Sequence, residues 1–227
     1  MRDRLEEMLE KHNLDHIRDA FLSEVEPYLN IEFVNVPGED IIPIGSSKAG
    51  GFPDLPPDIT PTAPFMAQIN LEQLDEFETP VPLPDGGFLF FFEDGVIPFN
   101  GLREDLVRRD DLNAVYRPAL LRITQGWLIP DADWVRVTFN PGPKFMVEYN
   151  ILEMESFVIS GIHRMFGMPD IINDDPCAND SRLLLQLDND DEFGLNLGAD
   201  GTVYWCIADI ALREWRFEQA TCVVQRL

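Results

Sequence analysis

The sequence Lys48-Ala49-Gly50-Gly51-Phe52-Pro53-Asp54 returns 116 residues later as Arg164-Met165-Phe166-Gly167-Met168-Pro169-Asp170. Each copy is followed by a short apolar run with a glutamine in it, Gln68 in the first copy and Gln186 in the second. The proline and the glutamine are 15 residues apart in the first copy and 17 in the second. A repeat with so long a period is not a solenoid unit, so it predicts two copies of one small module.

Hydrophobic patterning predicts helices near the N-terminus and strands through most of the remaining chain. Residues 2–26 carry apolar stripes at helical spacing, with Asn13 as a break and as the cap of a second helix. A further helix is expected within residues 148–160, and a short helix or turn at 209–212. Strands are expected at residues 31–36, 41–44, 65–69, 88–92, 120–124, 134–139, 183–187, 202–207 and 221–224.

This order of elements is an α+β pattern, with mainly antiparallel sheets built from two related half-modules and an N-terminal helix or helices. We expect a single domain over residues 1–227. Within it, residues 1–30 form an N-terminal helical segment, 31–115 the first half-module and 116–227 the second.

Charge and cysteine content narrow the classes of function. The chain has 41 acidic residues against 17 basic ones, a formal net charge of -24. Such a surface repels nucleic acid and anionic membranes and attracts basic proteins. The N-terminus is charged and lacks a signal peptide, so a cytoplasmic protein is expected. Cys177, Cys206 and Cys222 are odd in number and without CxxC spacing, which predicts neither a disulfide framework nor a zinc site.

Four ordered motifs resemble the signature of a known family. They are Ser47-Lys48-x-Gly50-Gly51-x-Pro53-x-Leu55-Pro56, Ala67-Gln68-Ile69-Asn70, Gly161-x-His163-Arg164-x-x-Gly167-x-Pro169-Asp170 and Leu183-Leu184-Leu185-Gln186-Leu187-Asp188-x-Asp190-Asp191. Their order and spacing are similar to those of the bacterial YwqG-like family, also called DUF1963, from about residue 20 to the C-terminus. The resemblance implies a duplicated α+β fold and no assigned activity, with toxin-immunity settings suggested for some members.

The repeated motifs supply the candidate ligand-binding residues, namely Lys48, Asp54, Gln68, His163, Arg164, Asp170 and Gln186. In one interpretation the two basic residues face each other across a cleft and bind a carboxylate or phosphate, with His163 as an acid or base. In the other, glycine and proline set a sharp loop and its charges bond to the backbone. The two glutamines either bridge backbone groups or read a peptide.

No metal site, cofactor or catalytic residue is predicted from the motifs. Residues 188–192 are rich in oxygen ligands, but the glycine and acid of an EF-hand would fall at Phe193 and Ala199. His12 and His16 have zinc spacing on a helix without a third ligand. Nucleophile elbows, Walker A loops and dinucleotide fingerprints are missing from the sequence.

The sequence therefore favours a cytoplasmic, non-catalytic binding protein, with no cofactor, that presents an acidic surface to a basic protein. Immunity against a basic toxin is its most concrete form. The alternative is a small-molecule binder or enzyme that uses a cleft between the two repeats around His163.

Overall fold

The computed structural model describes residues 2–157, 162–177 and 180–227. Its helices are α1 (Arg2–Lys11), α2 (Arg18–Glu24), α3 (Ala132–Phe139), α4 (Pro143–Phe157) and α5 (Asp209–Arg213). Short 3-10 helices are η1 (Asp15–Ile17), η2 (Glu39–Ile41), η3 (Leu71–Leu74), η4 (Arg103–Asp105) and η5 (Phe217–Gln219). The strands are β1 (Glu26–Asn35), β2 (Lys48–Ala49), β3 (Asp54–Leu55), β4 (Phe65–Asn70), β5 (Phe88–Phe92), β6 (Gly95–Phe99), β7 (Val107–Arg108), β8 (Ala119–Leu128), β9 (His163–Met165), β10 (Ser181–Asp188), β11 (Thr202–Ala208) and β12 (Thr221–Gln225).

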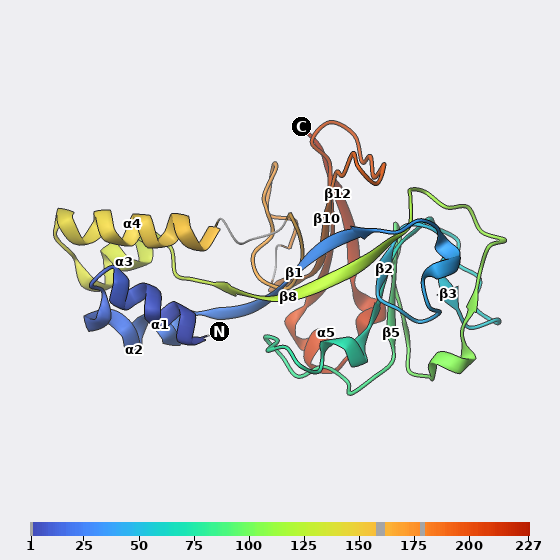
Figure 1. Cartoon of the computed structure of the whole chain (residues 1–227), viewed down its shortest axis with the longest axis horizontal. Coiled ribbons are helices and arrows are strands. Elements are labelled where there is room, and N and C mark those ends of the chain that lie inside the picture. The colour runs from blue at the N-terminus through green and yellow to red at the C-terminus, as the bar shows by residue number, and fades with distance from the viewer. Residues whose placement is uncertain (1, 158–161, 178–179) are drawn as a thin grey trace.

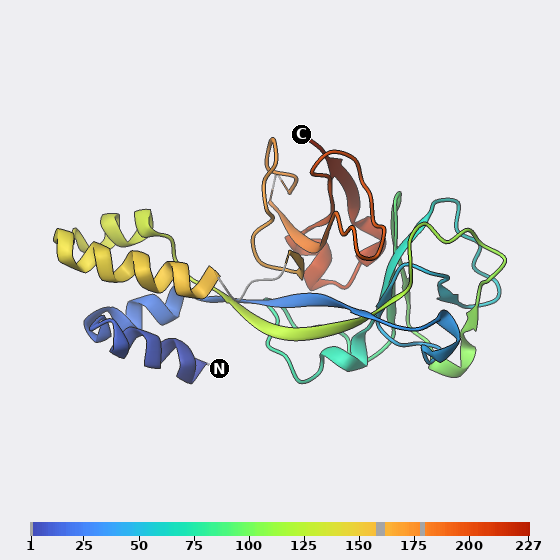
Figure 2. The same cartoon turned by 45° about the horizontal axis from the view of Figure 1, so that its top comes forward.

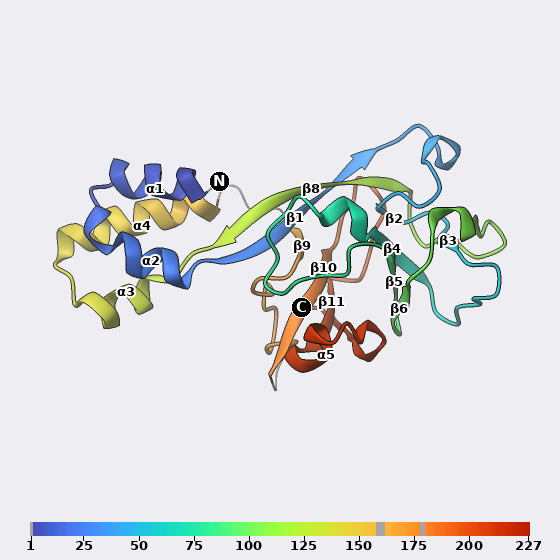
Figure 3. The same ribbon diagram turned by 90° about the horizontal axis from the view of Figure 1, so that it is seen from below.

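Ten of these strands form one antiparallel sheet in the order β12-β11-β10-β9-β1-β8-β2-β4-β5-β6, and β3 pairs with β7 apart from it. The α+β class with a mainly antiparallel sheet is therefore confirmed. The sheet curls so far that its two edge strands, β6 and β12, approach each other and nearly close it (Figure 3). β4 and β5 are buried along their whole length, which explains their unbroken apolar sequences.

The long strands β1 and β8 form the centre of the sheet. They pair over ten residues, from Glu26 opposite Leu128 to Asn35 opposite Ala119. On its other side β1 pairs with β9, whereas β8 pairs with β2. Each long strand therefore lies beside the motif strand from the opposite half of the chain, so neither half of the sheet is complete without the other.

A helical head, made of α1, α2, α3 and α4, protrudes from the sheet on the outer ends of β1 and β8 (Figures 1 and 2). Its side chains form a core separate from that of the sheet, including Leu9, Phe21, Val135, Tyr149 and Leu152. Helices from before β1 and after β8 pack together there because the antiparallel ladder brings these two chain ends to one place.

Three secondary-structure predictions are wrong. Residues 134–139 form α3 because the Asp131 side chain accepts from Trp134 N at 2.6 Å and caps a helix there. Residues 41–44 form no strand, since Pro43 has no N–H to donate and η2 turns the chain instead. The N-terminal helices end at Glu24, so residues 26–30 belong to β1.

Several other expectations agree with the structure. Asn13 breaks the N-terminal helices with a φ of 57°, although its side chain does not cap the second. The expected helix within 148–160 is α4, with residues 158–160 and the motif residue Gly161 outside the described part of the chain. The ends of the remaining expected strands lie within four residues of their expected positions, and β5 coincides with its expected range.

Cys177 and Cys206 form a disulfide with Cα atoms 5.3 Å apart, which contradicts the prediction from the odd cysteine count. The loop before β10 folds back onto β11, and this proximity cannot be read from cysteine spacing. Cys222 remains a free thiol. Disulfides are more typical of oxidising compartments, so the cytoplasmic location stays a prediction. Among the described residues, no helix combines the length and apolar content needed to cross a bilayer.

Both motif loops turn through two consecutive left-handed residues. They are Gly50 and Gly51, with φ of 62° and 63°, and Phe166 and Gly167, with φ of 63° and 72°. A Cβ on Gly50 would lie 2.3 Å from the Arg117 carbonyl oxygen, so only glycine fits there. Phe166 accepts the same backbone conformation, and its ring is 1% exposed in the core.

We predict that Gly50→Ala lowers the free energy of unfolding by more than about 2 kcal/mol, because a left-handed non-glycine residue costs roughly 1–2 kcal/mol before the backbone clash. Gly142→Ala is the matched control, since a Cβ there meets nothing within 4 Å. Urea denaturation measures both. Equal stability of the two variants would show that the loop relaxes around the methyl group.

Candidate functional site

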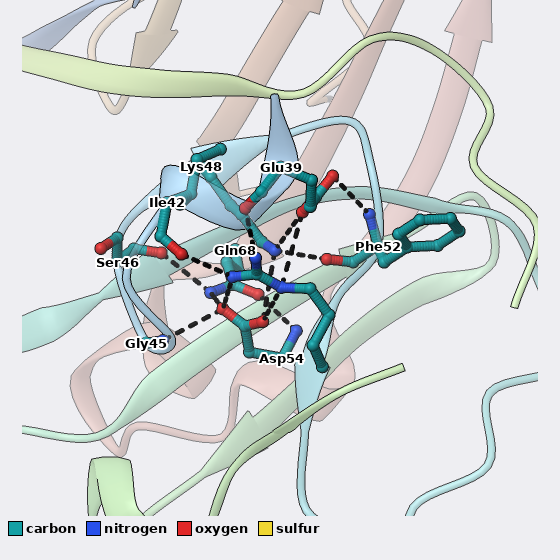
Figure 4. Close-up of polar contacts among 9 residues, drawn as sticks. Glu39, Ile42, Gly45, Ser46, Lys48, Phe52, Asp54 and Gln68 are labelled. Atoms are coloured by element: carbon teal, nitrogen blue, oxygen red, sulfur yellow. Dashed lines mark hydrogen bonds and ion pairs between the residues drawn. The ribbon is translucent and has the colours of Figure 1, made fainter. Parts of the chain in front are cut away.

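The first motif loop closes over a buried cluster of charges (Figure 4). Lys48 Nζ donates to Glu39 Oε1 at 2.7 Å and to the Phe52 carbonyl, and it lies 3.3 Å from Asp54 Oδ1. The side chains of Lys48 and Asp54 are both 0% exposed. Lys48 lies on β2 and Asp54 on β3, and the first motif loop between these strands turns the chain so that the two side chains meet.

Arg108, on β7, completes this cluster. Its Nε donates to Asp54 Oδ1 at 2.8 Å, and Gly45 N donates to Asp54 Oδ2 at 3.0 Å. Burial alone would raise the pKa of Asp54, but the hydrogen bond from Arg108 and the charge of Lys48 hold that pKa below its usual value. Burial lowers the pKa of Lys48, although Asp54 and Glu39 oppose this. The charged side chains of the cluster are therefore paired with one another.

The glutamines bridge the backbone in both copies. Gln68 Oε1 accepts from Asp54 N at 2.8 Å, and Gln68 Nε2 donates to the Ser46 carbonyl at 2.8 Å. Gln186 Oε1 accepts from Asp170 N at 2.9 Å, and Gln186 Nε2 donates to the Ile162 carbonyl at 3.2 Å. Each glutamine is also paired in register with the basic residue of its own motif. The backbone-bridging interpretation of the sequence therefore describes both sites.

The second cluster differs from the first in its access to solvent. Arg164 NH2 donates to Asp170 Oδ2 at 2.5 Å, but the Asp170 side chain is 54% exposed. Gln186 Nε2 also donates to Asp188 Oδ2 at 2.9 Å, and Thr202 donates to the other oxygen of Asp188. Burial raises the pKa of Asp188 despite these hydrogen bonds.

His163 lies beneath this second cluster and is 2% exposed. Its ring stacks on Phe33 with centroids 4.1 Å apart. Nδ1 accepts from Asp188 N at 3.1 Å, so the proton of the neutral ring is on Nε2, which lies 3.5 Å from Asp190 Oδ2. Burial lowers the pKa of His163, against the charges of Asp188 and Asp190. A general base would need the lone pair on Nδ1, but this lone pair already accepts the hydrogen bond from Asp188 N.

The structure does not bring the two motif clusters together. β2, which carries Lys48, and β9, which carries Arg164, are separated by β1 and β8 in the sheet. Three strand spacings are about 14 Å, so the two basic side chains do not flank one small ligand. A ligand-binding role of the seven candidate residues stays a prediction. The contacts show that five of them, all except Arg164 and Asp170, are fully or almost fully buried.

Three acid or base partners in these clusters were missed by sequence reasoning. Glu39 and Arg108 come from η2 and β7, and neither belongs to one of the motifs that the sequence analysis singled out. Asp188 was assigned to a solvated turn, but its carboxylate accepts from Thr202 and Gln186.

In the helical head, His12 contacts Glu148 and Glu155 at 3.4 and 3.2 Å and is 5% exposed. Within the described ranges no group of three or more His, Cys, Asp and Glu side chains is placed to hold a metal ion.

Comparison with known protein families finds one match. A domain of unknown function, DUF1963, matches residues 47–225. This range includes both motif loops, α3 and α4, and it begins after α1, α2 and β1. No curated protein matches the chain.

We predict that Lys48→Met lowers the free energy of unfolding by about 3 kcal/mol, because it leaves the buried carboxylates of Asp54 and Glu39 without one of their cations. Lys11→Met is the matched control. Lys11 pairs with Glu155 at 2.7 Å, but the two side chains are 60% and 39% exposed, so its loss costs less than about 1 kcal/mol. Urea titrations at pH 7 compare them, and similar losses would argue against a buried network.

We also predict that His163 makes the protein less stable in mild acid. Since the pKa of the folded-state imidazole lies below its ordinary value of about 6.5, its contribution is fully present above that pH and is lost below it, where the unfolded chain binds the proton first. His163→Gln retains an acceptor for Asp188 N but does not titrate. Melting temperatures from pH 7.5 to 5.5 should fall further in the wild type than in this variant, and parallel curves would contradict the assignment.

Proposed function

The chain belongs to the DUF1963 family, described as a domain of unknown function, and we propose that this member is a non-catalytic binding protein whose partner is a basic protein. The two motif clusters support a non-catalytic role, because their charges are paired with one another. The proposal rests on a different feature, an exposed apolar surface on the helical head.

The α4 stripe, made of Val147, Ile151 and Met154, carries this proposal. These side chains are 56%, 40% and 69% exposed, and they share one face of α4 at i, i+4 and i+7. On the opposite face Tyr149 and Leu152 are fully buried in the head. Apolar side chains at this spacing are the anchors by which a helix binds a partner helix or groove.

The charge around the stripe favours a basic partner. Residues 4–25 and 129–155 contain eleven acidic and five basic residues, a formal charge of -6. Glu148 and Glu155 flank the stripe about two turns apart on the side of α1. A second copy of the chain or an anionic membrane would meet like charge here, whereas a basic amphipathic helix would complement both the apolar face and the carboxylates.

Immunity against a basic toxin is the most concrete form of this function, and it is supported by the net charge of -24 and by the settings suggested for the family. The rival function, a small-molecule binder or enzyme around His163, has less support because that imidazole is buried and its Nδ1 is engaged.

We further propose that residues 31–115 and 116–227 are two copies of one ancestral half-module. Support comes from the equivalent glutamine bridges, from the paired left-handed residues in both loops and from the sheet order around β1 and β8. In each half the long strand, the motif strand, the glutamine strand and two further strands follow one another outward.

The test of the binding proposal uses a helical peptide of leucine and lysine, about 18 residues or five turns long, with its leucines on one face. A scrambled peptide of the same composition has no apolar face. We expect the wild type to bind the amphipathic peptide more tightly than the scrambled one, with affinity falling between 50 and 500 mM salt, as ordinary charge screening requires.

The double variant Val147→Lys and Met154→Lys should bind at least about tenfold more weakly, or about 1.4 kcal/mol. Ile210→Lys is the matched control, because Ile210 is 62% exposed on α5 in the sheet body. Unchanged affinity of the double variant would place binding elsewhere. Wild type that binds neither peptide, or that prefers neutral lipid vesicles or a second copy of itself, would overturn the proposal.

A further inference from the structure

Trp215 has a backbone conformation that its side chain disfavours. Its φ is 58°, in the left-handed region, which is uncommon for a bulky residue. The other non-glycine residues with positive φ in the described chain are four Asn or Asp and Phe166. Phe166 is 1% exposed, so core packing accounts for it, but Trp215 is 49% exposed.

The hydrogen bonds around Trp215 show which residue the backbone would favour. Arg216 N donates to the Ala211 carbonyl at 2.8 Å, and Trp215 N donates to the Leu212 carbonyl at 3.1 Å. This is the Schellman pattern that ends a helix, and its left-handed position is usually glycine. A tryptophan at this position of α5 therefore carries a conformational cost, and its side chain must offset that cost in another way.

Trp215 lines an apolar cavity of about 320 Å³. Phe217 of η5 and Pro98 and Phe99 of β6 also line this cavity. The Trp215 indole is held in place because its Nε1 donates to the Pro82 carbonyl at 2.9 Å. The residues that line the cavity include members of both β6 and η5, two elements that contact each other.

The chemistry of the cavity points to an aromatic ligand. A flat aromatic ligand can stack on the aromatic and proline rings that line the cavity. The cavity volume is at the lower end of the range for small-molecule sites. Glu214 and Asn100 supply oxygen acceptors among the lining residues. The Glu214 carboxylate pairs with Arg216 at 2.7 Å, but both side chains are exposed, so this pair is weak. The net charge of -24 disfavours anions.

We propose that the cavity between Trp215 and Phe99 is a binding site for a small aromatic amine, with the ring against Trp215 and the ammonium group toward Glu214. Attraction of a cation to the indole face would add to this preference. The site shares no residue with the α4 stripe, so the two proposals can fail separately.

Three probes of similar size test the site by ligand-observed NMR titration of the full chain. They are 2-phenylethylamine, benzyl alcohol and phenylacetate, which are cationic, neutral and anionic. For fragments of this size we expect a Kd near 1 mM for the amine. The alcohol should bind more weakly, and phenylacetate at least about tenfold more weakly than the amine. Equal binding of the amine and phenylacetate, or no binding of the amine at 10 mM, would overturn the assignment.

Two variants separate a binding role from a structural one. Trp215→Gly restores the residue that the helix end favours, so its melting temperature should stay within about 4 °C of wild type while amine affinity falls at least about tenfold. A larger fall in melting temperature would show that Trp215 is retained for stability.

Glu214→Gln alters only an exposed side chain and should remove the preference for the amine over the alcohol. An unchanged preference would overturn the placement of the ammonium group.

Discussion

The ten-residue antiparallel ladder between β1 and β8 joins every other part of the molecule. One side of the ladder pairs with β9 and the other with β2, so it carries the two motif loops on opposite flanks. Its outer end supports the helical head, since α2 precedes β1 and α3 follows β8. Each half of the sheet takes its long strand from the other half of the chain, so both halves of the chain contribute to each half of the sheet although the motifs occur twice.

The two motif loops have the same backbone conformation but different electrostatic surroundings. Both use a glutamine to satisfy the peptide group of the motif aspartate, and both turn through two left-handed residues. In the first loop the aspartate is buried, so Lys48 and Arg108 must both neutralise it. In the second it is half exposed, and Arg164 with solvent is enough. A buried carboxylate without cationic partners would be strongly destabilising. The Asp54 carboxylate therefore needs Arg108 of β7 as well as Lys48.

The features that suggest function lie away from these loops. The α4 stripe and the Trp215 cavity share one property, namely that apolar side chains are exposed where the fold does not require it. At the α4 stripe the opposite face of the helix already supplies the core of the head. At Trp215 the backbone itself would favour glycine. Both features lie within the range matched by the DUF1963 family, whereas α1 and α2, which complete the head, precede it. The formal net charge of -24 comes from acidic residues spread over the whole chain.

The amino-acid pattern alone was sufficient for the α+β class and the strands β4, β5, β10 and β11, because local periodicity and turn residues encode these features. The family was identified from the resemblance of four ordered motifs. The pattern was insufficient wherever residues distant in the chain determine the outcome. The helix α3, where a strand was expected, has a local cause in the Asp131 cap, whereas a loop folded onto β11 brought Cys177 to Cys206. Arg108 joined Asp54 only through the pairing of β7 with β3. The burial of His163 against Phe33, the exposure of the α4 stripe and the cavity at Trp215 likewise exist only in the folded chain, since burial is a property of packed surfaces and not of neighbouring residues in the sequence.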